Sequence, residues 1–178
     1  MRVATVFIAA AALLAAVGGR WLYAQSAQQP ARLSAEDRLE IRELVEAYSR
    51  GVDAYTPGLE GGPETASSVF TTDGVFVYSE RTVSGEAQLK KFFAENLKTH
   101  RSRWPHRHLL SNLMIEPTSE GAKGSVYLFQ IYLDDKSMPY ISAFGVYDDT
   151  FVRTSKGWRL RRRVYRQDAP PTAMPQPR

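Results

Sequence analysis

Apolar residues recur at helical spacing in the first part of the chain and at strand-like spacing later. Between positions 34 and 53 one helical stripe carries five of them: Ile41, Leu44, Val45, Tyr48 and Val52. Ser34, followed three positions later by Asp37, is a typical helix start. The pattern predicts a long amphipathic helix. If this helix continues through Gly51, Asp53 lies on the flank of the apolar stripe.

A second helix is predicted where Ser84-Gly-Glu86 can cap a run with four apolar residues at helical spacing: Leu89, Phe92, Phe93 and Leu97. Strands are predicted over five ranges: 75–78 (after a turn at 71–74), 108–115, 124–133, 140–154 and 158–165. Helices that come early and strands that come late indicate the α+β class, with a curved, mostly antiparallel sheet packed against N-terminal helices. Such a sheet forms a cone with an internal pocket.

The N-terminus resembles an export signal. Arg2 precedes an apolar run from Val3 to Val17, and Leu22-Tyr-Ala24 is an acceptable cleavage site. We therefore predict a signal peptide at 1–24, a linker at 25–33, a folded domain at 34–166 and a Pro-rich tail at 167–178. The protein is then periplasmic or secreted. An uncleaved membrane anchor is the alternative, because Trp21 and Tyr23 suit a membrane interface.

The chain has 178 residues, enough for one domain with a single core, and a mild net charge of +4. This charge gives no electrostatic support for a nucleic-acid-binding protein. The absence of Cys excludes a thiolate nucleophile and a cysteine metal site. No phosphate-binding glycine loop is present, and we predict no cofactor and no metal.

Two of the three histidines lie close together: His108 begins one predicted strand, and His106 precedes that strand with the same strand parity as His108. Alternation along that strand places His108, Leu110, Asn112 and Met114 on a single face. This pattern is compatible with a half-buried strand whose polar groups bond to nearby backbone. It is also compatible with a pocket that contains a titratable group.

Several short motifs, in a fixed order, resemble the nuclear transport factor 2-like superfamily, in particular its SnoaL-like and scytalone dehydratase-like branch. The motifs that carry the resemblance are Arg38–Tyr48 followed by Asp53, Val69–Phe76, Gly85–Leu89, Arg107–Asn112, Tyr147–Arg153 and Gly157–Arg161. Together they span roughly residues 34–166, which is nearly all of the predicted domain. The resemblance implies the same α+β fold and a homodimer formed through the outer face of the sheet.

In enzymes of this family an Asp at the end of the first helix and a His at the start of this strand meet in the pocket. The resemblance places these roles on Asp53 and His108. An imidazole titrates near neutral pH, so it can take a proton from carbon beside a carbonyl, or from a hydroxyl, and return it elsewhere. A buried carboxylate fixes the imidazole tautomer and stabilises the imidazolium. The resemblance thus implies a cofactor-free isomerase, lyase or cyclase for a small hydrophobic carbonyl or hydroxy compound.

The chain departs from the family's dehydratases, which use a second His on a later strand, because no His follows His108. Many relatives have no activity, so the alternative is a non-catalytic module for small-ligand binding or dimerisation. We expect further pocket contacts from six residues: Tyr48, Tyr55, Tyr78, Asn112, Phe129 and Phe144. His106 is interpreted as pocket rim or surface. The basic strand from Arg159 to Arg166 is interpreted as a solvated face, unless Arg161 or Arg163 reaches an anionic substrate or a dimer partner.

Overall fold

The structure is a computed structural model that describes residues 32–54, 61–100 and 106–168. The predicted signal peptide, and most of the predicted linker and tail, lie outside the described residues and stay predictions. Tyr55 also lies outside them. None of the helices in the described ranges combines the length and the apolar character needed to cross a bilayer.

Three helices and six strands follow one another in the order that the sequence predicts, with one added short helix, α3, and one added short strand, β2. The helices are α2 (Ala35–Asp53), α3 (Pro63–Ser68) and α4 (Glu86–His100). The strands are β1 (Phe70–Tyr78), β2 (Arg81–Ser84), β3 (His106–Thr118), β4 (Gly121–Leu133), β5 (Pro139–Thr154) and β6 (Gly157–Gln167). The predicted α+β class is confirmed.

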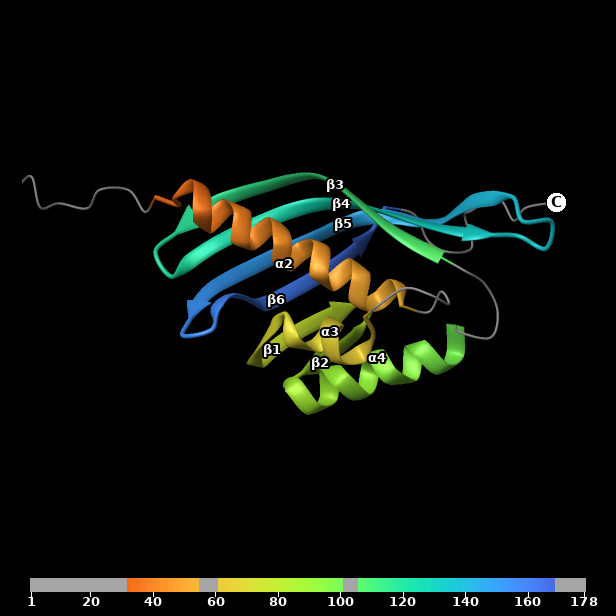
Figure 1. Cartoon of the computed structure of the whole chain (residues 1–178), viewed down its shortest axis with the longest axis horizontal. Coiled ribbons are helices and arrows are strands. Elements are labelled where there is room, and N and C mark those ends of the chain that lie inside the picture. The colour runs from red at the N-terminus through yellow and green to blue at the C-terminus, as the bar shows by residue number, and fades with distance from the viewer. Residues whose placement is uncertain (1–31, 55–60, 101–105, 169–178) are drawn as a thin grey trace, which may run out of the picture. The chain divides into compact units, whose positions relative to one another are not determined.

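The six strands form one curved sheet in the order β2-β1-β6-β5-β4-β3. All neighbouring pairs are antiparallel except β1 and β6, which are parallel. The helix α2 crosses one face of the long strands, whereas α3 and α4 lie beside β1 and β2 (Figure 1). The sheet is therefore mostly antiparallel, as predicted, and its helix-covered face holds the core.

The helix α2 begins and ends where the apolar stripe predicts. Ser34 caps it: the Ser34 hydroxyl accepts from the Asp37 N–H, and the Asp37 carboxylate accepts from the Ser34 N–H. Asp37 Oδ1 also accepts from Trp158 Nε1 of β6 at 3.0 Å, which fastens the start of the helix to the sheet. These hydrogen bonds, that from Trp158 first, lower the pKa of Asp37 to about 2.

The end of α2 depends on Gly51. A Cβ atom at Gly51 would lie 2.5 Å from the backbone nitrogen of Ala66, so only glycine lets α3 approach this closely. The helix continues through Gly51 to Asp53, and Asp53 therefore lies beside the apolar stripe. Close packing of α2 and α3 thus fixes the helix turn that carries Asp53.

Two strands differ from the prediction. The strand β1 begins at Phe70 and contains the predicted turn as an irregularity between Phe70 and Val75, where its register against β6 shifts. The strand β3 begins at His106 and is interrupted by a bulge between Ser111 and Met114. The bulge changes which β3 side chains face the core.

Candidate active site

Asp53 is the last residue of α2, and its side chain points toward the first residues of β3. Only 5% of the residue is exposed. The preceding residue, Val52, is part of the apolar core, and so is Tyr48, which lies one helical turn before Val52 on the same side of the helix. The apolar stripe therefore brings a carboxylate to the edge of the buried region.

His108 meets this carboxylate through two groups. Its ring nitrogen Nδ1 lies 2.6 Å from Asp53 Oδ1, and its backbone N–H donates to Oδ1 and Oδ2 of Asp53 at 3.0 and 3.1 Å. One carboxylate therefore binds both the backbone N–H and the ring of His108. The structure thus places a ring nitrogen of His108 within hydrogen-bond distance of the Asp53 carboxylate, the two residues to which the family resemblance assigns the catalytic pair.

This geometry selects an imidazole tautomer. An ionised carboxylate only accepts hydrogen bonds, so Nδ1 of His108 donates to it, and the neutral ring carries its lone pair on Nε2. The His108 side chain is about 10% exposed and lines a cavity. Nε2 is therefore the nitrogen that remains for a bound molecule.

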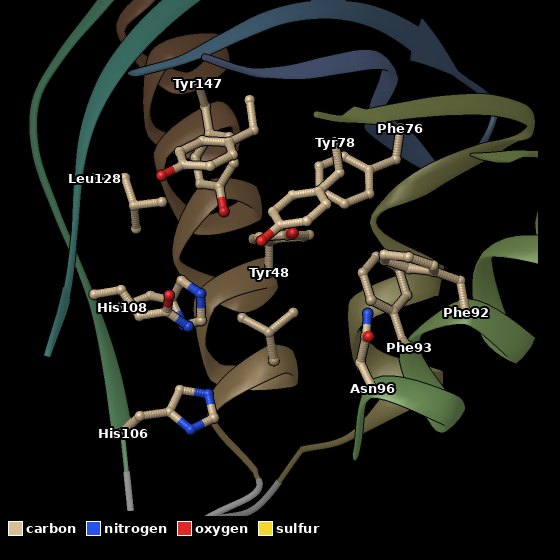
Figure 2. A pocket seen from close by; sticks show the side chains of 13 residues that line it. Tyr48, Phe76, Tyr78, Phe92, Phe93, Asn96, His106, His108, Leu128 and Tyr147 are labelled. Atoms are coloured by element: carbon tan, nitrogen blue, oxygen red, sulfur yellow. The ribbon is translucent and has the colours of Figure 1, made fainter. Parts of the chain in front are cut away.

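The cavity has a volume of about 190 Å³ and lies between the sheet and the helices. Its thirteen lining residues are Tyr48, Val52, Phe76, Tyr78, Phe92, Phe93, Asn96, His106, His108, Leu128, Gln130, Tyr147 and Tyr165. Figure 2 shows tyrosine rings gathered at one end, the two histidines projecting from β3, and the α4 side chains across from them. The lining is thus mainly aromatic, with an imidazole among the rings.

Tyr48 and Tyr78 line the cavity, as predicted. Asn112 does not, and the prediction that it shares a face with His108 is wrong. Ser111 pairs with Tyr127 and Met114 pairs with Ser125, so three steps along β3 match two steps along β4. Within this bulge Asn112 has φ of 55°. This extra residue inverts the alternation, so Asn112 is exposed and Ile115 packs in the core.

Phe129 and Phe144 do not line the cavity either, so their prediction as pocket residues is also wrong. Leu128 and Tyr147 occupy the inward positions of β4 and β5. Strand alternation then turns Phe129 and Phe144 to the opposite face, where they lie across from each other with ring centroids 6.4 Å apart.

One of the two interpretations of His106 placed it on the surface, and the structure shows that this interpretation is wrong. His106 is the first residue of β3, is 2% exposed and lines the cavity beside His108, with ring centroids 5.5 Å apart. Its ring stacks on Tyr132 at 4.9 Å. The same strand parity as His108, noted in the sequence, brings both rings to one side.

The metal-ligand atoms of His106, His108 and Asp53 lie within 4.8 Å of one another. However, Nδ1 of His108 and Oδ1 of Asp53 are already in hydrogen-bond contact at 2.6 Å. A metal ion bound by both would have to separate them and take the place of that hydrogen bond. As arranged, the three residues form a hydrogen-bonded pair beside a second imidazole.

Several cavity residues on α4, β4, β5 and β6 were not predicted from the sequence. Asn96 follows Phe92 and Phe93 at helical spacing, so its inward position was readable from the apolar stripe of α4. Tyr147 and Tyr165 lie opposite each other in the β5–β6 register, which no local pattern reveals. Their presence in the cavity lining follows from how β5 and β6 pair.

The basic strand β6 is not uniformly solvated, because Arg163 is fully buried. Its guanidinium donates to both carboxylate oxygens of Asp149, from Nε at 2.8 Å and from Nη2 at 2.6 Å. The guanidinium carbon lies 4.2 Å from the ring centroid of Tyr48 and 4.3 Å from that of Tyr147. Arg163 thus reaches neither solvent nor the cavity surface, so the interpretation of β6 as a solvated face does not hold for this residue.

Comparison with known proteins shows the family. Residues 33–164 match the family described as the SnoaL-like domain. An uncharacterized protein of Mycobacterium tuberculosis, Rv2910c, is 29% identical over 135 residues, which cover 72% of this chain and 83% of that protein.

Solved structures agree on the fold. A nuclear transport factor 2-like protein with a cystatin-like fold from Novosphingobium aromaticivorans matches with a TM-score of 0.63 at 22% identity, covering 73% of this chain and 80% of that one. ActVI-ORFA from Streptomyces coelicolor matches with a TM-score of 0.66 at 18% identity, covering 76% and 97%. The predicted fold and family are confirmed: the chain belongs to the SnoaL-like domain family.

Proposed function

We propose that this protein is a cofactor-free acid–base enzyme of the isomerase, lyase or cyclase type. In this proposal Nε2 of His108 takes a proton from a carbon beside a carbonyl, or from a hydroxyl, and returns it to another position of the same molecule. Asp53 holds the ring in the tautomer that leaves Nε2 unprotonated, and it stabilises the imidazolium that forms.

The observation that carries the proposal is the contact of 2.6 Å between Asp53 Oδ1 and His108 Nδ1 beside an aromatic cavity. A purely structural carboxylate could be satisfied by the backbone N–H of His108 alone. Here it also fixes a ring whose other nitrogen is left for a ligand. The alternative function, a small-ligand-binding module, uses the same cavity without proton transfer.

The size and lining of the cavity limit the substrate. Pockets for drug-sized ligands usually measure about 300–1,000 Å³, whereas this cavity measures about 190 Å³. A molecule with a single ring, or a chain of similar size, fits such a volume. The aromatic walls favour a hydrophobic body, and the tyrosine hydroxyls suit one or two oxygen atoms on it.

Deuterium exchange tests the proposal without knowledge of the natural substrate. A panel of one-ring ketones and hydroxy ketones is incubated with the protein in heavy water, and mass spectrometry follows deuterium incorporation beside the carbonyl. We expect saturable incorporation above the buffer rate for at least one compound. Saturable binding without incorporation for every compound that binds would favour the ligand-binding module.

We also propose that two copies associate through the outer face of the sheet. Four large apolar side chains on this face are between 38% and 63% exposed: Met114, Tyr127, Ile141 and Phe144. An exposed apolar face of this kind is typical of a protein interface. Light scattering at tens of micromolar should give a dimer mass, and Phe144→Asp should shift the mass toward the monomer. A monomer mass for the unchanged protein would contradict this part of the proposal.

A further inference from the structure

His106 is a buried titratable group that the proposed mechanism does not use. Proton transfer as proposed needs one imidazole, that of His108, whereas the cavity contains two. His106 lies two residues before His108 on β3 and is 2% exposed. Two imidazoles at this spacing on one strand are the usual nitrogen ligands of a transition-metal ion, so their geometry as a pair decides what they can bind.

The two rings are placed as a pair of metal ligands. Side chains two positions apart in a strand point to the same face, and both rings project from β3 toward the same side in Figure 2. Their centroids are 5.5 Å apart. A zinc ion binds an imidazole nitrogen at about 2.0–2.1 Å, which places the ion about 3.2 Å from the ring centre. Two rings at this separation can therefore share one ion at an angle close to the tetrahedral value.

The surroundings of both rings suit this arrangement. Nδ1 of His108 donates to Asp53 Oδ1 at 2.6 Å. A histidine that binds a metal commonly donates its other ring N–H to a carboxylate, which fixes the tautomer and makes the ligating nitrogen more basic. Nε2 of His108 is then the ligand, and the contact with Asp53 does not have to break. The ring of His106 is oriented by stacking on Tyr132, with centroids 4.9 Å apart and ring planes 12° apart.

We propose that His106 and His108 bind a divalent transition-metal ion of the zinc class. The ligands are Nε2 of His108 and one ring nitrogen of His106, water completes the coordination inside the cavity, and Asp53 acts through His108 as a positioning residue. Imidazole ligands favour Zn²⁺, Co²⁺ and Ni²⁺ over Mg²⁺ and Ca²⁺, which prefer oxygen ligands.

Such an ion is an inhibitor of the proposed reaction. It occupies the lone pair on Nε2 of His108 with which the ring would take a proton, and it fills part of the substrate cavity. Binding of the ion is independent of the proposed function, whereas the inhibition rests on it. The two parts are therefore tested by different measurements.

Cobalt(II) is the probe for binding, because it takes the place of zinc and its visible absorption strengthens when protein ligands replace part of its water. The protein, without a histidine tag, is titrated with Co²⁺ and the absorbance is followed. We expect a saturable band at one ion per chain that excess Zn²⁺ removes and excess Mg²⁺ leaves unchanged. A titration without a saturable band would overturn the inference.

Variants assign the band to its ligands. His106→Phe keeps a ring that can stack on Tyr132 but removes the nitrogens, and the band should be lost. His100→Gln removes the third histidine of the chain and is the matched control, which should keep the band. Asp53→Asn should weaken binding of Co²⁺ by about 10–100-fold. A band that persists in His106→Phe, or that His100→Gln alone abolishes, would contradict the ligand assignment.

NMR spectroscopy of the unchanged protein, labelled with nitrogen-15 histidine, gives a test that does not depend on how the variants fold. Addition of Zn²⁺ should shift the signals of Nε2 of His108 and of one ring nitrogen of His106, while Nδ1 of His108 keeps its proton. Shifts confined to His100, or loss of the proton on Nδ1, would overturn the proposed ligand set.

Deuterium exchange separates failure of this inference from failure of the proposed function. Saturating Zn²⁺ should suppress exchange into a ketone of the panel, and a chelator should restore it. Exchange that continues unchanged at saturating Zn²⁺ would overturn the inhibition. Binding of Co²⁺ together with no exchange for any ketone would contradict the proposed function and support the metal site.

Discussion

Asp53→Asn is expected to lower the rate of deuterium exchange by roughly 10²–10⁴-fold while the domain stays folded. The carboxylate of Asp53 accepts from both the backbone N–H and the ring Nδ1 of His108. An amide at this position can donate through its NH₂ group, which favours a proton on Nε2 and leaves Nδ1 as the acceptor. The nitrogen that faces the cavity then has no lone pair with which to take a proton.

NMR spectroscopy of the protein labelled with nitrogen-15 histidine tests this change of tautomer directly. The unchanged protein should show His108 protonated at Nδ1, and Asp53→Asn should move part or all of the population to the Nε2-protonated form. Met114→Leu, at a side chain of the same strand that is 63% exposed, is the control for both measurements. An Asp53→Asn variant with the exchange rate of the unchanged protein would show that the carboxylate has no part in the chemistry.

Asp149→Ala is expected to lower the free energy of unfolding by about 3–5 kcal/mol. Arg163 is fully buried, and its guanidinium forms an ion pair with Asp149 through two hydrogen bonds. Although burial opposes its charged form, the Asp149 carboxylate raises the pKa of Arg163, so the guanidinium remains charged. Removal of the carboxylate leaves that charge buried without compensation.

Urea unfolding measures this loss. Arg163→Met with Asp149→Leu should recover most of the stability, because the double variant leaves no unpaired ion. Lys123→Ala is a suitable comparison, since it breaks an ion pair with Glu116 whose side chains are 63% and 53% exposed. That exposed pair should contribute much less to stability than the buried pair. Equal losses for Asp149→Ala and Lys123→Ala would contradict the structural account of the buried pair.

The sequence predicted the elements whose signals are local. The stripe that includes Ile41 and Tyr48 is one continuous run with a Ser34 cap, and it predicted the first helix, which spans Ala35–Asp53. The order of helices and strands then indicated the fold class. Asp53 and His108, in contrast, are 55 positions apart, and only the family resemblance related them before the structure did.

The errors come from features that depend on pairing between strands. Ser111-Asn112 gives only a weak hint of a bulge, namely that Asn tolerates positive φ, so simple alternation placed Asn112 in the pocket. Phe129 and Phe144 are aromatic whichever face they occupy, and their orientation follows from the β4–β5 register. Arg163 belongs to a run of arginines, and only its pairing with Asp149 across two strands reveals that it is buried.

Replacement of the His108 ring distinguishes a base that Asp53 orients from a structural histidine. Deuterium exchange into the best ketone of the panel is measured for the unchanged protein and for His108→Ala, together with the melting temperatures of both. We expect exchange to fall at least about 10²-fold while the melting temperature changes by only a few degrees, because the ring lines a cavity and fills no part of the core. Exchange that persists in a folded His108→Ala would show that His108 is not the base, and a melting temperature that collapses together with exchange would identify the pair as structural.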